Sequence, residues 1–311
     1  MKQVRIRVPA SSANLGPGFD SLGLALTLYH YLTVTERDGE GIEIHLAGEG
    51  AHDLPRDEEN AVYRAMDGFF RDSRYRPGHL TIESESEIPV ARGLGSSAAA
   101  VLSGLAAAAL LAGREVEEPA MMALAAGVEG HVDNVAASLL GGFCVVGPSM
   151  RSGGGSVTEL GQYIRMEAPE GLAAAVAVPD FTVDTRRARE VLPATVAFGD
   201  AVANQARVAM LTAAMASGRL DLLAAAMQDC LHESHRAALV PGLDRVRRAA
   251  MEAGAYGAVL SGSGPSVLAL VRSGDDAPGR AMQEAWQQEG VSSRALLLGI
   301  DRVGLRAEGS D

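Results

Sequence analysis

The stretch from residue 89 to residue 99 combines residue types that suit the binding of a phosphate group. Gly93 and Gly95 flank Leu94 and are followed directly by Ser96 and Ser97. Glycine allows positive φ angles and a close approach of the backbone to a ligand. A helix that begins at the two serines would add unpaired amides and the positive end of its dipole, and both favour an anion. The stretch therefore predicts a phosphate-binding loop, although a serine-capped helix after a turn explains it equally well when it is taken alone.

Two other phosphate-binding patterns fit this loop less well. The P-loop requires a Lys after its glycines, and none follows here. The dinucleotide fingerprint Gly-x-Gly-x-x-Ala is formally met by Gly93, Gly95 and Ala98, with Glu115 about twenty residues further on. That fingerprint requires a buried apolar strand before it, whereas the charged run 83–87 precedes this loop. A nicotinamide-binding loop is therefore disfavoured.

Charged and amide side chains elsewhere in the chain suit the recognition of a small zwitterion. Asp20 can pair with an ammonium group and Asn14 can form neutral hydrogen bonds, but both are also common turn residues beside glycine. Arg189 and Arg236 can bind a carboxylate through two parallel hydrogen bonds. Most arginines nevertheless lie on solvated helix faces. Residue type alone leaves both explanations open for each position.

The composition disfavours several classes of protein. A net charge of −12 and a pI of about 5.1 would repel a nucleic-acid backbone. Cys144 and Cys230 provide neither a disulfide framework nor a cysteine zinc site. The N-terminal residues contain no apolar segment typical of a signal peptide, and the Ala- and Leu-rich stretch 98–112 is too short to cross a bilayer. We expect a soluble, cytoplasmic protein.

Hydrophobic periodicity predicts a mixed α+β order rather than a regular βαβ alternation. Apolar residues at strand spacing indicate strands within 4–8, 24–34, 42–46, 80–82, 173–178, 258–260, 267–271 and 294–301. Helical spacing indicates a helix after Asn60 and further helices within 96–112, 118–140, 186–191, 199–217, 219–235, 241–253 and 277–288. The Gly-rich stretch 152–155 is the best candidate for a linker.

Five segments, taken together and in this order, resemble the GHMP kinases, a family named for galactokinase, homoserine kinase, mevalonate kinase and phosphomevalonate kinase. The segments are Pro9-Ala10-Ser11-Ser12-Ala13-Asn14-Leu15-Gly16-Pro17-Gly18-Phe19-Asp20, the loop Pro89-Val90-Ala91-Arg92-Gly93-Leu94-Gly95-Ser96-Ser97-Ala98-Ala99, Glu129-Gly130-His131-Val132-Asp133-Asn134-Val135-Ala136, Thr185-Arg186-Arg187-Ala188-Arg189-Glu190-Val191-Leu192-Pro193 and Ser261-Gly262-Ser263-Gly264-Pro265-Ser266. The first, third and fourth are similar to the homoserine kinase branch in particular. Val132 and Ala137 stand where relatives often carry Pro, a departure that affects the backbone rather than the chemistry.

The resemblance implies a two-lobed α+β fold. Residues 1–155 would form an N-terminal ATP-binding lobe like ribosomal protein S5 domain 2, and residues 156–311 a ferredoxin-like C-terminal lobe. ATP and the second substrate would meet in the cleft between the lobes. The partners implied are ATP with Mg²⁺ and L-homoserine, which would be phosphorylated in threonine biosynthesis, with no nucleic acid and no membrane. The oligomeric state is left open, with a homodimer as one alternative.

The resemblance also implies which residues bind the nucleotide and its metal ion. Asn60 would lie near the adenine. Ser97 and Glu129 would hold Mg²⁺, which prefers one or two carboxylates together with phosphates and water. The remaining nucleotide contacts would come from Pro89, Arg92, Gly93, Leu94, Gly95, Ser96 and Ala98.

For the amino-acid substrate, the resemblance implies a match of opposite charges. Asp20 would bind the ammonium group, and Arg189 and Arg236 would bind the carboxylate. Further substrate contacts would come from Asn14, His131, Gly262 and Gly264, and the reaction centre would include Asp133, Asn134 and Thr185. The substrate hydroxyl would attack the γ-phosphorus in line, oriented by an amide side chain and the γ-phosphate itself, while a role for the aspartate as general base stays open.

Two alternatives compete with this interpretation. Another GHMP kinase would act on an isoprenoid or a sugar alcohol, but such a substrate needs neither an ammonium partner at Asp20 nor two carboxylate-binding arginines. A non-catalytic member of the fold would bind a metabolite only, but it would not need Glu129, Ser97 and Asn14 together.

Overall fold

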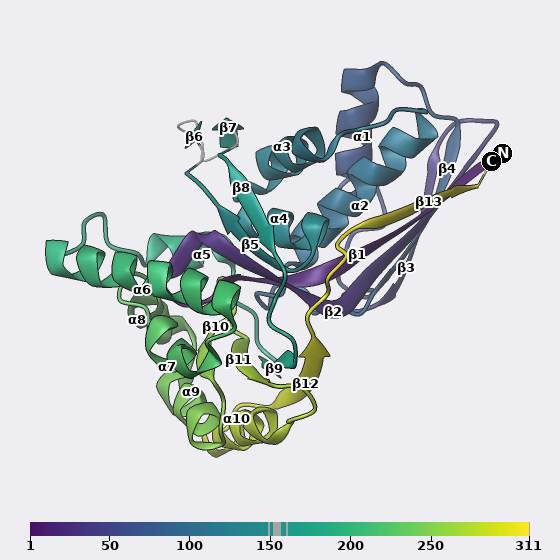
Figure 1. Ribbon diagram of the computed structural model, residues 1–311. Helices are drawn as coiled ribbons and strands as arrows, with labels where there is room; N and C mark the ends of the chain where they lie inside the picture. The colour runs from purple at the N-terminus through teal and green to yellow at the C-terminus, as the bar shows by residue number, and fades with distance from the viewer. Residues whose placement is uncertain (149, 152–156, 160, 311) are drawn as a thin grey trace.

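The protein folds into two lobes, each built on one large sheet (Figure 1). The computed structural model describes residues 1–148, 150–151, 157–159 and 161–310. In chain order, its elements are β1 (Lys2–Asn14), β2 (Gly18–Arg37), β3 (Ile42–Gly48), α1 (Ala61–Ser73), β4 (His79–Ser86), α2 (Ser96–Leu111), α3 (Glu118–Glu129), α4 (Asp133–Leu140), β5 (Phe143–Val146), β6 (Met150–Arg151), β7 (Val157–Glu159), β8 (Tyr163–Met166), β9 (Leu172–Pro179), α5 (Thr185–Glu190), α6 (Phe198–Ser217), η1 (Leu220–Leu222), α7 (Leu223–Ala226), α8 (Glu233–Arg236), η2 (Ala237–Leu239), α9 (Leu243–Glu252), β10 (Gly257–Leu260), β11 (Val267–Arg272), α10 (Ala277–Gln288), β12 (Ser293–Gly299) and β13 (Arg306–Ser310).

The first lobe is organised around the long antiparallel pair of β1 and β2. Its sheet has the order β13-β1-β2-β4-β3, with β5 paired to β2 and β8 paired to β5. Alternation of Val4, Ile6 and Val8 with two arginines predicted a half-buried strand, and all three apolar side chains are buried. The turn between the two long strands, from Asn14 to Gly18, lies at the junction between the lobes and places the motif 9–20 there.

Helices α1 to α4 lie together on one face of this sheet (Figure 1). The Ala-rich helix α2 packs against β1, α1 and α3 and is buried on nearly all sides, as expected for a helix that is apolar all round. Gly104 lets α1 approach it closely, because a Cβ there would lie 2.4 Å from the Val62 carbonyl oxygen. This packing fixes the first turn of α2, where the predicted phosphate loop ends.

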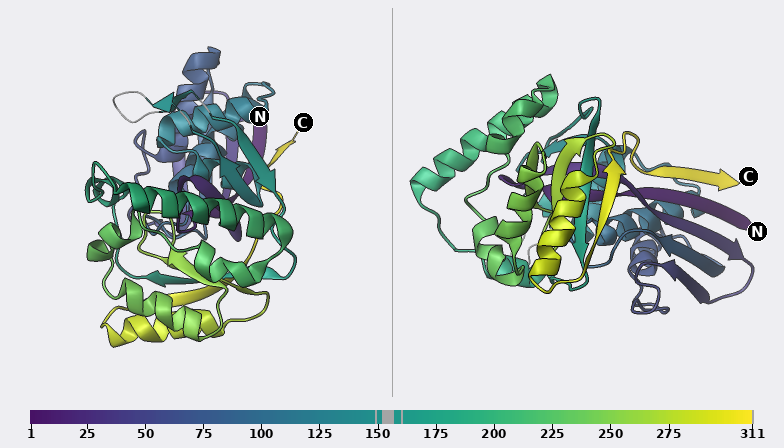
Figure 2. Two further views of the ribbon diagram at one scale, coloured as in Figure 1. Left: turned by 60° about the vertical axis from the view of Figure 1, so that its left-hand side comes forward. Right: turned by 90° about the horizontal axis from the view of Figure 1, so that it is seen from below.

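The second lobe has a four-stranded antiparallel sheet of order β10-β11-β9-β12. Helices α9 and α10 cover one of its faces, as two further views show (Figure 2). Strand order and helix placement are those of a ferredoxin-like lobe. The fully buried Trp286 of α10 anchors this layer, and its indole N–H donates to the Pro241 carbonyl oxygen at 3.0 Å.

Strand β9 joins the two hydrophobic cores. Every residue of Leu172–Pro179 is buried, so both faces of the strand are covered. Ala174 and Val176 pack into the core that includes the first lobe, whereas Ala173 and Ala175 pack against the helices of the second lobe. A strand buried on both faces explains the continuous apolar run from which it was predicted.

The chain crosses between the lobes twice. It leaves the first sheet after β8 and returns to it through β13, which pairs with β1. Strands β8 and β13 belong to the sheet of the first lobe, although both lie after residue 155. The predicted division into 1–155 and 156–311 therefore differs from the division between the two sheets and stays a prediction. The predicted linker 152–155 lies outside the described residues.

Two stretches predicted as continuous helix are interrupted. Region 118–140 divides into α3 and α4, because Gly130 ends α3 in a left-handed conformation. The prediction of helix throughout 219–235 was wrong, since only short helical pieces occur there. The carboxylate of Asp229 accepts hydrogen bonds from three following backbone N–H groups and so replaces helical bonding at this point. Strands β5, β6, β7, β8 and β13 were not predicted.

Helix α6 is the longest of the described helices and lies on the outside of the second lobe (Figure 1). Phe198, Val202 and Met210 on this helix are exposed. Neither α6 nor any other helix over the described residues combines the length and apolar character needed to cross a membrane.

Candidate active site

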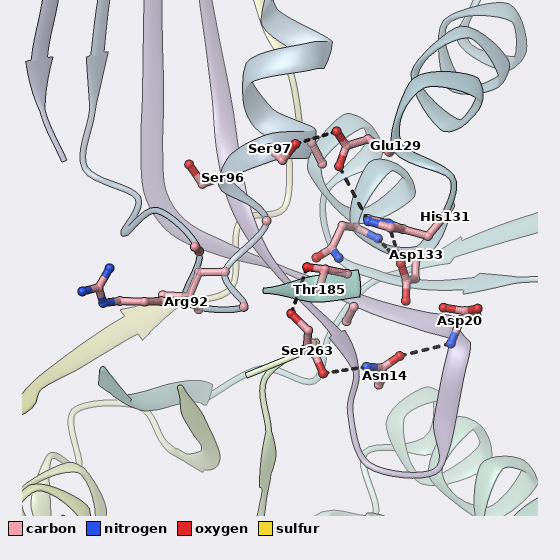
Figure 3. Close-up of a pocket in the computed structure, with 18 of the residues that line it drawn as sticks. Asn14, Asp20, Arg92, Ser96, Ser97, Glu129, His131, Asp133, Thr185 and Ser263 are labelled. Carbon is pink, nitrogen blue, oxygen red and sulfur yellow. Dashed lines mark hydrogen bonds and ion pairs between the residues drawn. The ribbon is translucent and has the colours of Figure 1, made fainter. Parts of the chain in front are cut away.

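A cavity of about 110 Å³ lies where the two lobes meet, and we call it the first cavity. Its walls come from segments far apart in the sequence, and most of them carry the motifs singled out above. Figure 3 shows Ser97, Glu129, His131 and Asp133 following one another along one wall, with Asn14 and Ser263 on the opposite side.

The structure brings nearly all predicted site residues to this cavity. Those that line it are Asn14, Asp20, Pro89, Arg92, Gly93, Leu94, Gly95, Ser96, Ser97, Ala98, Glu129, His131, Asp133, Asn134, Thr185, Arg189, Arg236 and Gly262. Gly264 does not line it but packs beside Gly93, and Asn60 lines a neighbouring cavity. The lining residues that were not predicted are Ala13, Phe19, Ala91 and Ser263. They lie within the same motifs, but residue type alone did not single them out.

The loop before α2 has the backbone conformation that the sequence predicted. Gly93 and Gly95 have φ angles of 72° and 71°. Gly95 is the N-cap of α2, and no side chain caps the helix by a hydrogen bond. The serine-capped alternative is therefore not supported. Backbone N–H groups at the positive end of α2 belong to the cavity-lining residues Ser96, Ser97 and Ala98, which is the arrangement that favours a phosphate.

We expect Gly95→Ala to destabilise the protein more than Gly113→Ala. Both glycines have positive φ, at 71° and 61°, and each substitution should cost about 1–2 kcal/mol for that reason. A Cβ at Gly95 would also lie 2.1 Å from Ser11 Oγ, whereas nothing lies within 4 Å at Gly113. The clash should add about 1–3 kcal/mol. Urea unfolding of the two variants measures the difference, and equal losses would show that the loop relaxes around the new side chain.

Glu129 and Ser97 form an oxygen-rich pair at the meeting point of two helix ends. Glu129 is the last residue of α3, where the helix dipole is negative and favours a cation. Ser97 Oγ donates to Glu129 Oε1 at 2.6 Å, and the carboxylate is only 7% exposed. A hydroxyl and a carboxylate are hard oxygen donors that fit Mg²⁺. Within the described parts of the chain, no group of three or more His, Cys, Asp or Glu could hold a metal ion, so phosphates and water would have to complete the set.

His131 lies between two carboxylates, with Nε2 3.6 Å from Glu129 and Nδ1 3.3 Å from Asp133. Burial lowers the pKa of His131, but the two carboxylates outweigh this effect and raise its pKa above the usual value. Asp133 Oδ1 also accepts a hydrogen bond from the Asn134 backbone N–H at 2.8 Å. These contacts fix the position of the Asp133 carboxylate in the cavity wall.

Asn134 is oriented by a chain of hydroxyl groups. Ser11 Oγ donates to Asn134 Oδ1 at 3.0 Å, and Ser138 Oγ donates to Ser11 Oγ at 2.9 Å. Because its oxygen is engaged, the Nδ2 amide is the end of Asn134 that can donate to a ligand in the cavity. Ser11 was not predicted as a site residue, although it lies within the motif 9–20.

Asp20 and Arg189 bind each other across the junction of the lobes. Arg189 donates to both Asp20 oxygens, at 2.7 and 3.1 Å, and the two side chains remain 23% and 33% exposed. Burial lowers the pKa of Arg189, but Asp20 more than compensates, and the net pKa is raised. Asn14 fixes the loop, because its Oδ1 accepts from the Asp20 N–H and its Nδ2 donates to the Gly262 carbonyl oxygen. The pair thus presents one negative and one positive group to the same cavity.

Arg236 is almost completely buried behind this pair. It donates to the carbonyl oxygens of Ala188 and Gly262, each at 3.0 Å, and so connects α5 to the Ser261–Ser266 loop. Burial, assisted by Arg189, lowers its pKa to about 10, which leaves it charged at neutral pH. The ring of Phe19 contacts both guanidinium groups. Arg236 lines the cavity, and its predicted contact with a carboxylate stays a prediction.

Two further predicted residues connect the cavity walls. Thr185 begins α5, and its Oγ1 lies 3.2 Å from Ser263 Oγ. Arg92 donates to the carbonyl oxygens of Val90, Pro179 and Asp180 and is directed away from the cluster of acidic residues (Figure 3). Arg92 therefore ties the phosphate loop to the end of β9.

A second cavity of about 430 Å³ adjoins the first and shares Ala91, Ser96, Ser97 and Thr185 with it. Its walls are largely apolar and include Leu46, Leu54, Pro55, Val62, Val90 and Val183. Asn60 lies here as the N-cap of α1, where its Oδ1 accepts from the Val62 N–H and its Nδ2 donates to the Pro55 carbonyl oxygen. Asn60 thus shapes the wall of this cavity.

His30, which also lines the second cavity, makes the stability of the protein depend on pH. Burial lowers its pKa from the usual 6.5 to about 4. The unfolded chain therefore binds a proton that the folded protein does not, and His30 destabilises the fold as the pH falls from about 6.5 toward 4. The difference corresponds to about 3 kcal/mol at roughly 1.4 kcal/mol per pH unit.

We therefore expect His30→Gln to lose less stability on acidification than the wild type. Urea unfolding at pH 7 and at pH 4 measures the change, and His52→Gln serves as the control because His52 is exposed. If His30→Gln and the wild type lose equal stability between the two pH values, the buried imidazole does not resist protonation.

The comparisons with known proteins agree on one family. The family model described as GHMP kinases N terminal domain matches residues 60–142, and the model described as GHMP kinases C terminal matches residues 211–292. The chain is 44% identical over 286 residues to a homoserine kinase of Moorella thermoacetica, covering 92% of this chain and 93% of the relative. It is 40% identical over 305 residues to a homoserine kinase of Microchaete diplosiphon, with coverage of 98% and 97%. The chain belongs to the homoserine kinase family of the GHMP kinases.

Solved structures of the family share its architecture. A homoserine kinase crystal structure from Cytophaga hutchinsonii has a TM-score of 0.85 at 31% identity, covering 98% of this chain and 97% of the other. A mevalonate kinase crystal structure has a TM-score of 0.70 at only 15% identity, a likeness of fold alone. These similarities confirm the predicted two-lobed GHMP kinase fold and the homoserine kinase resemblance.

Proposed function

We propose that the protein transfers the γ-phosphoryl group of ATP to the side-chain hydroxyl of L-homoserine, giving ADP and O-phospho-L-homoserine. The observation that carries this function is the meeting of three devices in the first cavity: the phosphate-binding loop, the Glu129–Ser97 pair and the Asp20–Arg189 pair. Family membership at 40–44% identity supports the choice of substrate. The product would serve threonine biosynthesis in the cytoplasm.

The nucleotide would extend across both cavities. Its base would occupy the apolar second cavity, near Asn60, and its phosphates would lie over the N-terminal turn of α2. Ser97 and Glu129 would hold Mg²⁺, which when bound neutralises the charge on the β- and γ-phosphates.

The amino acid would bind beside the Asp20–Arg189 pair. Its ammonium group would contact Asp20, and its carboxylate would contact Arg189 with support from Arg236. Arg189 and Asp20 already hold each other in position by hydrogen bonds. The substrate would therefore bind to two side chains that are in place before it arrives. Binding would therefore need little reorganisation of side chains.

The transfer itself requires mainly positioning. The homoserine oxygen attacks the γ-phosphorus, the bond from that phosphorus to the β–γ bridging oxygen breaks, and ADP leaves with the electron pair. The hydroxyl proton passes to a γ-phosphate oxygen. Asn134 Nδ2 and Thr185 Oγ1, which belong to two residues lining the cavity, would orient the two reacting groups.

The activity is tested by ADP release with L-homoserine, serine, threonine, mevalonate and galactose as separate acceptors. We expect L-homoserine to give the highest kcat/KM, with an absolute requirement for ATP and Mg²⁺. Serine has one methylene fewer and should place its hydroxyl short of the phosphorus. Turnover of mevalonate or galactose without turnover of homoserine would overturn the proposed function.

A further inference from the structure

One polar atom in the second cavity has no partner. His30 is only 4% exposed, and its Nε2 is buried without a hydrogen bond. Among the residues that line this cavity, all within the described part of the chain, His30 alone has such an atom. Asn60 uses both ends of its amide, and Ser86 Oγ accepts from the Ile88 N–H at 3.1 Å.

The backbone leaves His30 little freedom to seek a partner elsewhere. It lies in the middle of β2, paired with Val8 on one side and with Ser86 on the other. Buried polar groups in folded proteins almost always have a hydrogen-bond partner, and an exception that faces a cavity points to a missing ligand or water. The strand therefore presents a fixed, unsatisfied hydrogen-bonding group to a cavity whose walls are largely apolar.

The charges around the cavity indicate what kind of group His30 would meet. Burial lowers the pKa of His30 to about 4, so the imidazole is neutral at physiological pH. Three carboxylates, Glu49, Glu59 and Asp184, line the cavity against one cation, Arg186, so the lining carries a net negative charge that disfavours an anion. A neutral imidazole can donate or accept one hydrogen bond but cannot neutralise a charge. The site suits a flat, uncharged heterocycle better than a phosphate or a carboxylate.

We propose that His30 is a specificity residue for the nucleotide base, and that its imidazole forms a hydrogen bond with the edge of the adenine ring. This inference deepens the proposed ATP-dependent function and rests on it. Apolar side chains such as Leu46 and Val183 would contact the base around this bond, and the shared residues Ser96 and Ser97 lead from the base to the phosphate loop. Asn60, which the resemblance places near the adenine, would then form part of the cavity wall without a hydrogen bond to the base.

The test begins with His30→Phe, which removes the hydrogen bond and keeps a planar ring. We expect the KM for ATP to rise about tenfold, while kcat and the KM for homoserine change less than about twofold. His52→Phe is the control, because His52 is exposed and lines neither of the two cavities. A folded His30→Phe variant with an unchanged KM for ATP would overturn the inference and leave His30 with a bound water.

Four ATP analogues, each lacking the N1, N3, N7 or N6 hydrogen-bonding group of the base, identify the contact. In the wild type, one of them should bind less tightly than ATP, and His30→Phe should abolish that difference. If His30→Phe fails to fold, His30→Gln provides the comparison, since an amide reaches a different point of the base and should change the ranking of the analogues. The same ranking in the variant and in the wild type would overturn the inference.

Direct binding of ADP by calorimetry separates this inference from the proposed function. Weaker ADP binding to His30→Phe supports the contact with the base even if homoserine proves not to be the acceptor. Full homoserine kinase activity combined with unchanged ADP binding by the variant would overturn the role of His30 and leave the proposed function standing.

Discussion

Replacing Glu129 with glutamine is expected to raise the Mg²⁺ concentration needed for half-maximal activity by about 100-fold. An amide is a much poorer ligand than a carboxylate for a hard cation. Substitution of groups that only support a metal ligand already lowers affinity by about 10- to 100-fold, so loss of a direct carboxylate should reach the upper end of that range. The measurement is a Mg²⁺ titration of ADP release at saturating ATP and homoserine.

Glu118→Gln is the matched control for this experiment. Glu118 begins the helix that Glu129 ends, and its carboxylate accepts a hydrogen bond from the Tyr163 hydroxyl, away from the first cavity. Urea unfolding of both variants shows whether loss of the bond from Ser97 to Glu129 affects the fold. An unchanged Mg²⁺ titration for Glu129→Gln would reduce Glu129 to a structural residue at a helix end.

The second large effect is expected at the Asp20–Arg189 pair. Asp20→Asn removes the negative charge proposed for the substrate ammonium group, and Arg189→Lys replaces a planar two-pronged donor by a point charge. Hydrogen bonds to charged groups contribute roughly 1.5–3 kcal/mol. At about 1.4 kcal/mol per tenfold, each variant should lose about one to two orders of magnitude in kcat/KM for homoserine, with little change in the KM for ATP.

Two controls separate charge from loop structure. Asp20 has a φ of 56°, a conformation that asparagine also tolerates, so Asp20→Asn should keep the loop. Arg187→Lys changes an exposed arginine of the same helix and should have no effect. Because Asp20 and Arg189 bind each other, the losses in the double variant should not add. If Asp20→Asn weakened ATP and homoserine equally, the loop would have misfolded and the ammonium assignment would fail.

The parts of the site that depend on local chemistry were predictable from the sequence. Glycine tolerates positive φ where other residues are strained, so the left-handed turn at Gly93 and Gly95 before a helix could be predicted, whereas phosphate binding by this loop stays a prediction. Asn60 could likewise be placed at the start of α1, because asparagine is a favoured N-cap residue, and its Oδ1 accepts a hydrogen bond from the Val62 N–H. Hydrophobic periodicity predicted the order of helices and strands along the chain but not how the strands pair in sheets. The two-lobed fold was therefore predicted from the resemblance alone.

Contacts between distant segments were not predictable in the same way. Asp20 and Arg189 were each assigned to a substrate charge, and only the folded chain shows that they bind each other. The interruption of the helix at Gly130 aligns Glu129, His131 and Asp133 along one wall, although the apolar pattern continues through it. His30 occupied an ordinary strand position in the sequence, and its missing partner became evident only with the cavity beside it.

The two-sided burial of β9 also limits how substrates enter and products leave. Ala174 and Val176 belong to a core cluster that continues into the first lobe, so a hinge that swung the lobes apart would divide this cluster and expose apolar surface to water. The resulting free-energy penalty opposes a clamshell cycle of opening and closing. Exchange of ADP and phosphorylated product should instead use the existing mouth of the cavities, through small local movements of the surrounding loops, so that turnover does not wait for a motion of whole lobes.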